Sequence, residues 1–296
     1  MQKTNTFDRT VEDLGNVVSL EHVNTRVPDQ RLATIFYVMG LGLTRDPYLV
    51  VGVDNTWINV GNCQFHLPVG PAQVLRGVTG LVLPDLDALA ARLASVAPRL
   101  EGTRFAFVKH DDRIEVTCPW GNRIRCHAPD AGRFGRITLG MPYVQVDVRR
   151  GTAAGIVRFY RDILGAPGQV GQADGAPCAR VFIGLGETLV FRETDAVLVP
   201  FDGHHIQVAL ADFSGPHARL HARGLITEES NRSQYRFERI IDLDSGAELA
   251  VIEHEVRSMR HPMFARALLN RNPEQTNAQY APGHEGWVAA MSPIPV

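Results

Sequence analysis

The sequence has few cysteines, no long apolar run and almost no net charge. Its 296 residues include four cysteines without a C-x-x-C pair, which predicts reduced, mostly strand-buried thiols in a cytoplasmic protein. No run of 18 apolar residues is present, so no membrane-spanning helix is expected. The first residues lack the apolar centre of a signal peptide. The net charge of −2 gives no electrostatic footprint for nucleic acid.

What the sequence does have is a weak internal repeat. The segments GVTGLVLPD (77–85) and GHHIQVALAD (203–212) are both apolar strands that reach an aspartate and then enter a helix-like stretch. Repetition of a supersecondary unit determines the architecture of a chain, so it is tested first. A length of 296 residues also suggests two domains.

Turn signals and hydrophobic periodicity divide the chain into four similar units, each a strand, a helix and further strands in the order βαβββ. The first strands of the units are predicted at 17–24, 81–83, 142–148 and from His205 onward. Helices are predicted from Pro28 to Met39 and at 87–96, 152–163 and 216–223. The remaining strands are predicted at 48–53, 56–60, 63–67, 105–109, 113–117, 123–126, 179–183, 187–192, 234–241 and 248–253.

These units predict an α+β protein in which neighbouring units form pairs. Residues 17–128 are expected to form an N-terminal domain and residues 140–255 a C-terminal domain, joined by a polar, glycine-bearing linker near 129–133. Residues 256–296 are expected to form an extended tail, because the sequence there is rich in proline, asparagine and glutamine.

Four segments resemble the vicinal oxygen chelate superfamily. IFYVMGLG (35–42) and VRFYRDILG (157–165) are similar to its "FY…LG" helix end. PWGNRI (119–124) resembles its "DPDGNRIEL" turn, and HIQVALAD (205–212) its "HIAFEVDD" strand. The resemblance spans roughly residues 17–255 and implies paired units around concave mixed sheets. It also implies glyoxalase, extradiol dioxygenase or antibiotic-resistance functions, among which fold alone does not choose.

The resemblance implies a metal site in the C-terminal domain. His205 stands at the first-strand ligand position and Glu253 on the last strand, although the register leaves Ala250 as an alternative for the latter. Tyr143 stands where a further histidine is expected, and Gln145 shares its face by strand alternation. Two histidines and a carboxylate are typical of non-haem Fe(II), with Mn(II) or Zn(II) as alternatives, and no metal binds if the site is degenerate.

We interpret the other polar residues through the same resemblance. Tyr143 and Tyr235 are candidate catalytic groups, and Gln145 and Arg192 are candidate substrate-binding groups. The N-terminal domain contains His22, Gln64 and His66, which could form a site of their own. However, Arg125 replaces an acidic ligand in that domain, so we predict it to be a non-catalytic partner.

Three functions remain open. The first is an extradiol-type dioxygenase that cleaves a catechol-like aromatic diol. The second is another vicinal oxygen chelate enzyme, an isomerase or lyase in which a carboxylate such as Glu253 moves a proton. The third is a metal-free binding protein or cofactor-independent enzyme. In each case the partner is a small molecule, without nucleic acid or membrane, and a homo-oligomer is expected.

Overall fold

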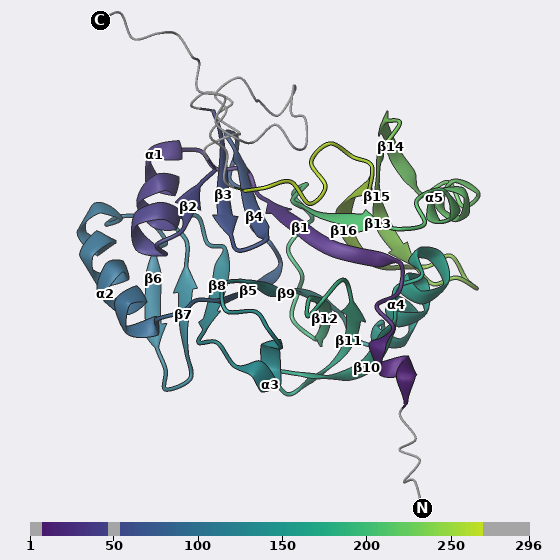
Figure 1. The fold of residues 1–296 in the computed structure, drawn as a ribbon, viewed down its shortest axis with the longest axis horizontal. Coiled ribbons are helices and arrows are strands. Elements are labelled where there is room, and N and C mark those ends of the chain that lie inside the picture. Colours follow the sequence, from purple (N-terminus) through teal and green to yellow (C-terminus); the bar gives the residue numbers. More distant parts are fainter. Residues whose placement is uncertain (1–7, 47–53, 269–296) are drawn as a thin grey trace, which may run out of the picture.

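Two eight-stranded mixed sheets form the body of the protein (Figure 1). The computed structural model describes residues 8–46 and 54–268, so the strand predicted at 48–53 lies outside the described residues. The first sheet contains, in spatial order, β14 (Ile226–Asn231), β15 (Gln234–Ile241), β16 (Glu248–Ser258), β13 (His205–Leu210), β1 (Val17–Asn24), β4 (Cys63–Pro68), β3 (Asn55–Val60) and β2 (Thr44–Arg45).

The second sheet repeats this arrangement. Its order is β10 (Gly168–Ala173), β11 (Ala176–Phe182), β12 (Thr188–Thr194), β9 (Gly140–Arg149), β5 (Gly77–Val82), β8 (Arg123–His127), β7 (Arg113–Thr117) and β6 (Ala106–Lys109). In both sheets the two central strands pair antiparallel, and each central strand has a parallel neighbour from its own unit. The predicted α+β architecture of four repeated units is confirmed.

Helices cover one side of each sheet and bury their apolar faces against it. Asp85 caps α2 (Leu86–Val96) by accepting from the amide of Ala88, and the helix buries Leu89, Leu93 and Val96. The remaining helices are α1 (Gln30–Ala33) continued by a π-helical segment (Thr34–Gly40), α3 (Ala131–Phe134), α4 (Ala153–Phe159) continued by a π-helical segment (Tyr160–Leu164), α5 (Ser214–His221), and short 3₁₀ turns at Arg9–Glu12 and Ala97–Arg99.

The predicted pairing of units is wrong. Strand pairing places the first unit with the fourth in the first sheet, and the second unit with the third in the second sheet. The boundaries 17–128 and 140–255 therefore cut across both sheets. β5 and β9 belong to consecutive units and pair with each other, which leaves β1 to pair with β13 from the far end of the chain. Figure 1 shows β1, coloured purple, beside the green β13.

Besides the two short 3₁₀ turns, four elements were not predicted, namely α3, β2, β10 and β14. The sequence GQVGQA of β10 and the polar sequence ITEESN of β14 carry no apolar run. Both strands lie at sheet edges, where a strand pairs with only one neighbour. The four cysteines are free and buried, as predicted. Among the described residues, no helix has the length and apolar character needed to cross a membrane.

Candidate metal centre

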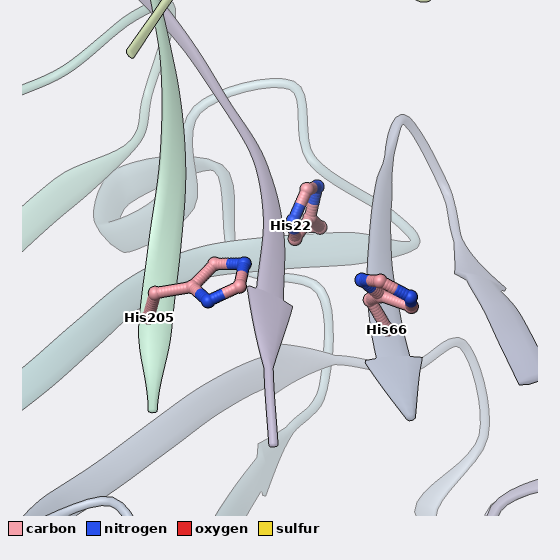
Figure 2. A group of neighbouring side chains, drawn as sticks. All are labelled: His22, His66 and His205. Atoms are coloured by element: carbon pink, nitrogen blue, oxygen red, sulfur yellow. The ribbon is translucent and has the colours of Figure 1, made fainter. Parts of the chain in front are cut away.

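Three histidines from three adjacent strands of the first sheet converge on one point (Figure 2). His22 lies on β1, His66 on β4 and His205 on β13. One ring nitrogen from each lies within 4.8 Å of the others. Two ligands of one ion lie at most ~4.2 Å apart when each bond is ~2.1 Å, so small movements of these side chains bring all three within bonding distance.

The central strands relate the two units by a local two-fold axis. His22 lies opposite Gln207, and Asn24 lies opposite His205. Because this pairing is reciprocal, the axis exchanges His22 with His205 and Asn24 with Gln207. His22 and His205 are therefore the same position in two copies of the βαβββ unit.

The parallel neighbours extend this symmetry to a fourth position. His66 on β4 lies beside Asn24, and Glu255 on β16 lies beside Gln207. The axis therefore exchanges His66 with Glu255, whose Oε2 lies 3.6 Å from Nε2 of His205. Three imidazoles and one carboxylate thus occupy the symmetric positions at the centre of the sheet.

The imidazoles are suited to donate to an ion because burial keeps two of them neutral. Burial lowers the pKa of His22 and that of His66 well below the usual range, and nearby positive groups add to the effect. A neutral imidazole has a free lone pair for a metal. Among the described residues, Nε2 of His22 and Nε2 of His205 are buried without a hydrogen-bond partner. Buried polar atoms normally have one, so these two nitrogens fit the role of metal ligands.

His66 is held by two amides and a ring. Nδ2 of Asn24 lies 2.6 Å from its Nδ1, its Nε2 lies 2.7 Å from Oδ1 of Asn55, and Trp57 stacks on it with ring centroids 3.8 Å apart. These contacts fix the orientation of the imidazole. An ion bound at Nδ1 would replace the Asn24 amide as the partner of that nitrogen.

Two glutamates and two arginines form the other wall. Arg236 pairs with both Glu253 and Glu255, and Arg257 lies 2.7 Å from Oε1 of Glu255. Oε1 of Glu253 lies 3.1 Å from Nδ1 of His205. Burial opposes ionisation of Glu253, but its hydrogen bond to His205 and the charge of Arg236 lower its pKa. A carboxylate on Nδ1 directs Nε2 of His205 toward an ion, as in carboxylate–histidine–metal arrangements.

The chain after β16 covers this region. A cavity of about 40 Å³ lies between His22, Glu21 and residues 263–268, which we call the covering segment. Arg266 of this segment forms a buried ion pair with Asp46. The volume is sufficient for one or two water molecules but not for an aromatic ring.

The structure brings together two predicted ligands and resolves the register between them. Glu253, and not Ala250, is the partner of His205 on the neighbouring strand. Ala250 instead pairs with Ile240, nearer the start of β16. His22 and His66, which we had predicted to belong to a non-catalytic domain, lie at the same centre.

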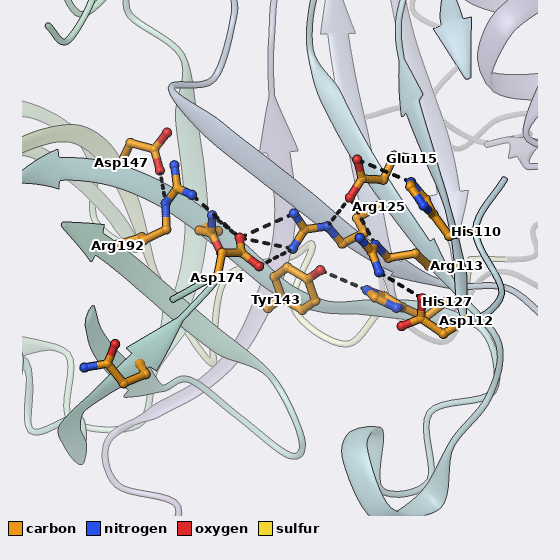
Figure 3. Close-up of polar contacts among 12 residues, drawn as sticks. His110, Asp112, Arg113, Glu115, Arg125, His127, Tyr143, Asp147, Asp174 and Arg192 are labelled. Carbon is orange, nitrogen blue, oxygen red and sulfur yellow. Dashed lines mark hydrogen bonds and ion pairs between the residues drawn. The ribbon is translucent and has the colours of Figure 1, made fainter. Parts of the chain in front are cut away.

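The other predicted site residues do not lie at this centre. Tyr143, Gln145 and Arg192 belong to β9 and β12 of the second sheet, so the expectation that Tyr143 replaces a ligand beside His205 is wrong. Figure 3 shows Tyr143 and Arg192 among the polar residues of that sheet. Tyr235 is also misplaced: it packs in the core against Phe213, on the opposite face from the histidines. Its neighbour Arg236 faces the site, because adjacent residues of a strand point to opposite faces.

Sequence reasoning missed Glu255 and Arg236 as site residues. The signal for Glu255 was present in the segment EHE (253–255), where alternation puts both glutamates on one face and His254 on the other. The structure shows this arrangement, since His254 is buried and lies 2.6 Å from the Tyr160 hydroxyl. No sequence signal distinguished Arg236 from the other arginines on strands.

A scan against protein-family models finds no match, and a search of curated proteins finds none. Solved structures do match. A candidate dioxygenase from Bacillus subtilis shares 14% identity with a TM-score of 0.56, covering 90% of each chain. Glyoxalase I from Zea mays shares 12% identity with a TM-score of 0.57, covering 81% of this chain and 92% of its own. At these identities the likeness establishes the fold alone: the chain has the glyoxalase-like fold of repeated βαβββ units in two sheets.

Proposed function

We propose that the chain is a metal-dependent enzyme whose ion is held by His22, His66 and His205, with Glu255 as a fourth ligand. The observation that carries the proposal is the convergence of the three imidazoles within 4.8 Å at the centre of the first sheet. Their strands come from both ends of the sequence, so ordinary local packing does not account for the cluster. The unpartnered nitrogens of His22 and His205 add to it.

Fe(II) is the ion that we propose. Imidazole and carboxylate donors suit Fe, Mn and Zn, whereas the four thiols that would favour a soft-metal site are not part of the cluster. The choice between Fe(II), Mn(II) and Zn(II) rests on the reaction proposed below and is decided by metal analysis.

The reaction that we propose is ring cleavage of a catechol-like aromatic diol by O₂, and fold similarity to a candidate dioxygenase over 90% of both chains supports it. When bound by four protein ligands, a six-coordinate Fe(II) would supply two open positions, which suit the two vicinal oxygens of the diol, and a third position for O₂ would require Glu255 to leave the ion. The chain's own residues hold that centre in place: Glu253 fixes His205, while Arg236 and Arg257 fix the glutamates. An aromatic substrate needs more than the 40 Å³ cavity, so the covering segment must move for it to enter.

A glyoxalase-type isomerase is the second candidate. It is favoured by the similarity to glyoxalase I from Zea mays, which covers 92% of that chain. In this alternative, a carboxylate at the centre, Glu253 or Glu255, would move a proton between carbons of a substrate whose vicinal oxygens bind the metal. A homo-oligomer in the cytoplasm remains a prediction for either function.

Metal analysis and oxygen uptake test the proposal. The full chain is purified without chelators, its metal content is measured by mass spectrometry, and it is reconstituted with Fe(II) without oxygen. We expect about one ion per chain and oxygen uptake with catechol. His22→Ala should lose both. His110→Ala is the matched control, because His110 is partly exposed on the second sheet's side and should keep both.

Each outcome separates the alternatives. A chain that binds no metal after reconstitution with Fe(II), Mn(II) or Zn(II) would overturn the metalloenzyme proposal and leave a metal-free function. A metal-loaded chain that shows no oxygen uptake but is active in a glyoxalase assay would replace the dioxygenase with the isomerase.

A further inference from the structure

The concave face of the second sheet holds a separate and larger pocket. Its volume is about 460 Å³, compared with about 40 Å³ beside His22. Strands β8, β9, β10, β11 and β12 line it, and α3 contributes Arg133 and Phe134 at one side. None of the candidate metal ligands lines it, so it is distinct from the metal centre.

The charged residues that line this pocket are mostly arginines. Three arginines, Arg125, Arg133 and Arg180, line it together with a single carboxylate, that of Asp174. Arg180 donates to the backbone carbonyl of Gln172 at 3.3 Å, and no carboxylate of the described residues lies within ion-pair distance of it. The lining therefore carries more cationic than anionic groups, which favours an anionic ligand.

Asp174 shows how an oxyanion is held here (Figure 3). Its carboxylate oxygens lie 3.1–3.4 Å from the guanidinium nitrogens of Arg125, and Nε2 of Gln145 lies 3.4 Å from one of them. Arg192 approaches the same carboxylate at 3.8 Å. Asp174 lies in the turn between β10 and β11, where donors from three strands meet, two of them, Arg125 and Gln145, from the pocket lining.

The pocket also has an apolar side. Phe134, Phe182 and Val190 line it, and Tyr143 lies among the same lining residues. The Tyr143 hydroxyl lies 2.9 Å from Nε2 of His127. Burial, with the charges of Arg133 and Arg125, lowers the pKa of His127 to about 4, so this imidazole adds no charge at neutral pH. An apolar body with one anionic end matches such a lining.

From this geometry we propose that the second sheet binds a small organic oxyanion, a carboxylate or a phosphate ester carrying an aromatic or apolar body. Arg180 and Arg133 bind the anionic group, and the phenyl rings of Phe134 and Phe182 contact the body. The site needs no metal and is independent of the reaction at the first sheet. It therefore goes beyond the proposed function.

Calorimetric titration of the full chain tests this site with three probes. Benzoate and phenyl phosphate carry the two kinds of oxyanion, and benzamide is the neutral isostere of benzoate. We expect one of the two anions to bind at least ~10-fold more tightly than benzamide. Whether benzoate or phenyl phosphate binds more tightly shows whether the site prefers a carboxylate or a phosphate. Arg180→Gln and, separately, Arg133→Gln should each weaken binding by ~10-fold.

Two further variants separate this proposal from the metal centre. Arg150→Gln removes an exposed arginine that pairs with Asp195 outside the pocket, and should bind the anion as the unchanged chain does. His66→Ala should lose metal but keep anion binding, whereas Arg180→Gln should keep its metal. The proposal is overturned if neither anion binds at millimolar concentration, if benzamide binds equally well, or if both pocket variants bind as the unchanged chain does.

Discussion

The two sheets share one topology but differ at four corresponding positions. The first sheet has His22, His205, His66 and Glu255 there. In the second sheet, the pairing of β5 with β9 places Val78 and Tyr143 at the positions of His22 and His205. The parallel neighbours β8 and β12 place Arg125 and Val190 at the positions of His66 and Glu255. Three nitrogen donors and a carboxylate are therefore replaced by two apolar side chains, a phenol and a guanidinium, which together cannot hold a divalent ion.

The comparison shows that the same arrangement of strands can carry a site suited to a cation in one sheet and a site suited to an anion in the other. In the first sheet, burial keeps the His22 imidazole neutral, and the two glutamates balance the charges of Arg236 and Arg257, so neutral nitrogen donors remain for a bound cation. In the second sheet, a guanidinium takes the place of a ligand, and the charged residues that line the pocket are three arginines and one aspartate. The main-chain geometry is shared, so the side chains at the centre of each sheet decide what it binds.

The largest expected effect is on metal content. His205→Ala should reduce bound metal from about one ion per chain to near zero, because it removes one of three convergent imidazoles. Tyr143→Phe alters the corresponding position of the second sheet and should leave metal content unchanged. Mass spectrometry measures both, and circular dichroism checks the fold. Normal metal content in His205→Ala would remove the metal centre from the first sheet.

The two glutamates should differ in importance. Glu255 occupies the position symmetric with His66, whereas Glu253 orients His205 through its Nδ1. Loss of an orienting partner costs ~10–100-fold in metal affinity, so Glu253→Gln should fall in that range and Glu255→Gln should lose more. Competition with a chelator measures the affinities. Equal losses would contradict the assignment of Glu255 as a ligand, and a reversed order would mean that Glu253 is the ligand.

A partly buried glutamate at the contact between the two sheets should make the free energy of unfolding depend on pH. Glu187 precedes β12 and accepts a hydrogen bond from the amide of Leu20 on β1, and burial raises its pKa to about 7. The unfolded side chain titrates near 4.5, so its contribution to stability is complete below that pH and is lost as the pH rises through 7. The difference corresponds to about 3 kcal/mol.

Denaturant unfolding between pH 4 and pH 8 measures this dependence. Glu187→Gln cannot ionise and should flatten the curve in that range. Glu21 also contributes, because burial raises its pKa to about 7 as well, so some slope should remain in the variant. An unchanged curve in Glu187→Gln would show that this carboxyl titrates alike in the folded and unfolded chain.

The smallest expected effect concerns one glycine of the second sheet. A Cβ at Gly80 would lie 2.3 Å from Cε1 of Tyr143, so Gly80→Ala must displace that ring. Overpacking of this kind costs about 1–3 kcal/mol and should also weaken binding of the anion. Gly171→Ala is the matched control, since its Cβ would meet nothing within 4 Å. Equal thermal stability of the two variants would contradict the close approach of the Tyr143 ring.

Elements with strong periodicity were predicted well from the sequence. The helix at 87–96 differs from α2 by one residue at its start, because a capping aspartate and a buried leucine stripe mark it. Two strands without an apolar run, β10 and β14, were missed. The candidate site was predicted in part: His205 and Glu253 were identified, but Tyr235 was chosen in place of Arg236 through an error of one residue in strand phase.

By itself, the sequence determined the repeated βαβββ unit, since periodicity, turn residues and caps act over a few neighbouring residues. It also marked His22, His66, His205 and Glu253 as chemically unusual on their strands. Only the tertiary structure decided which units share a sheet. The first strands of all four units are similar apolar segments, and nothing local specifies that β1 pairs with β13 across most of the chain. That long-range pairing places histidines from both ends of the sequence at one centre.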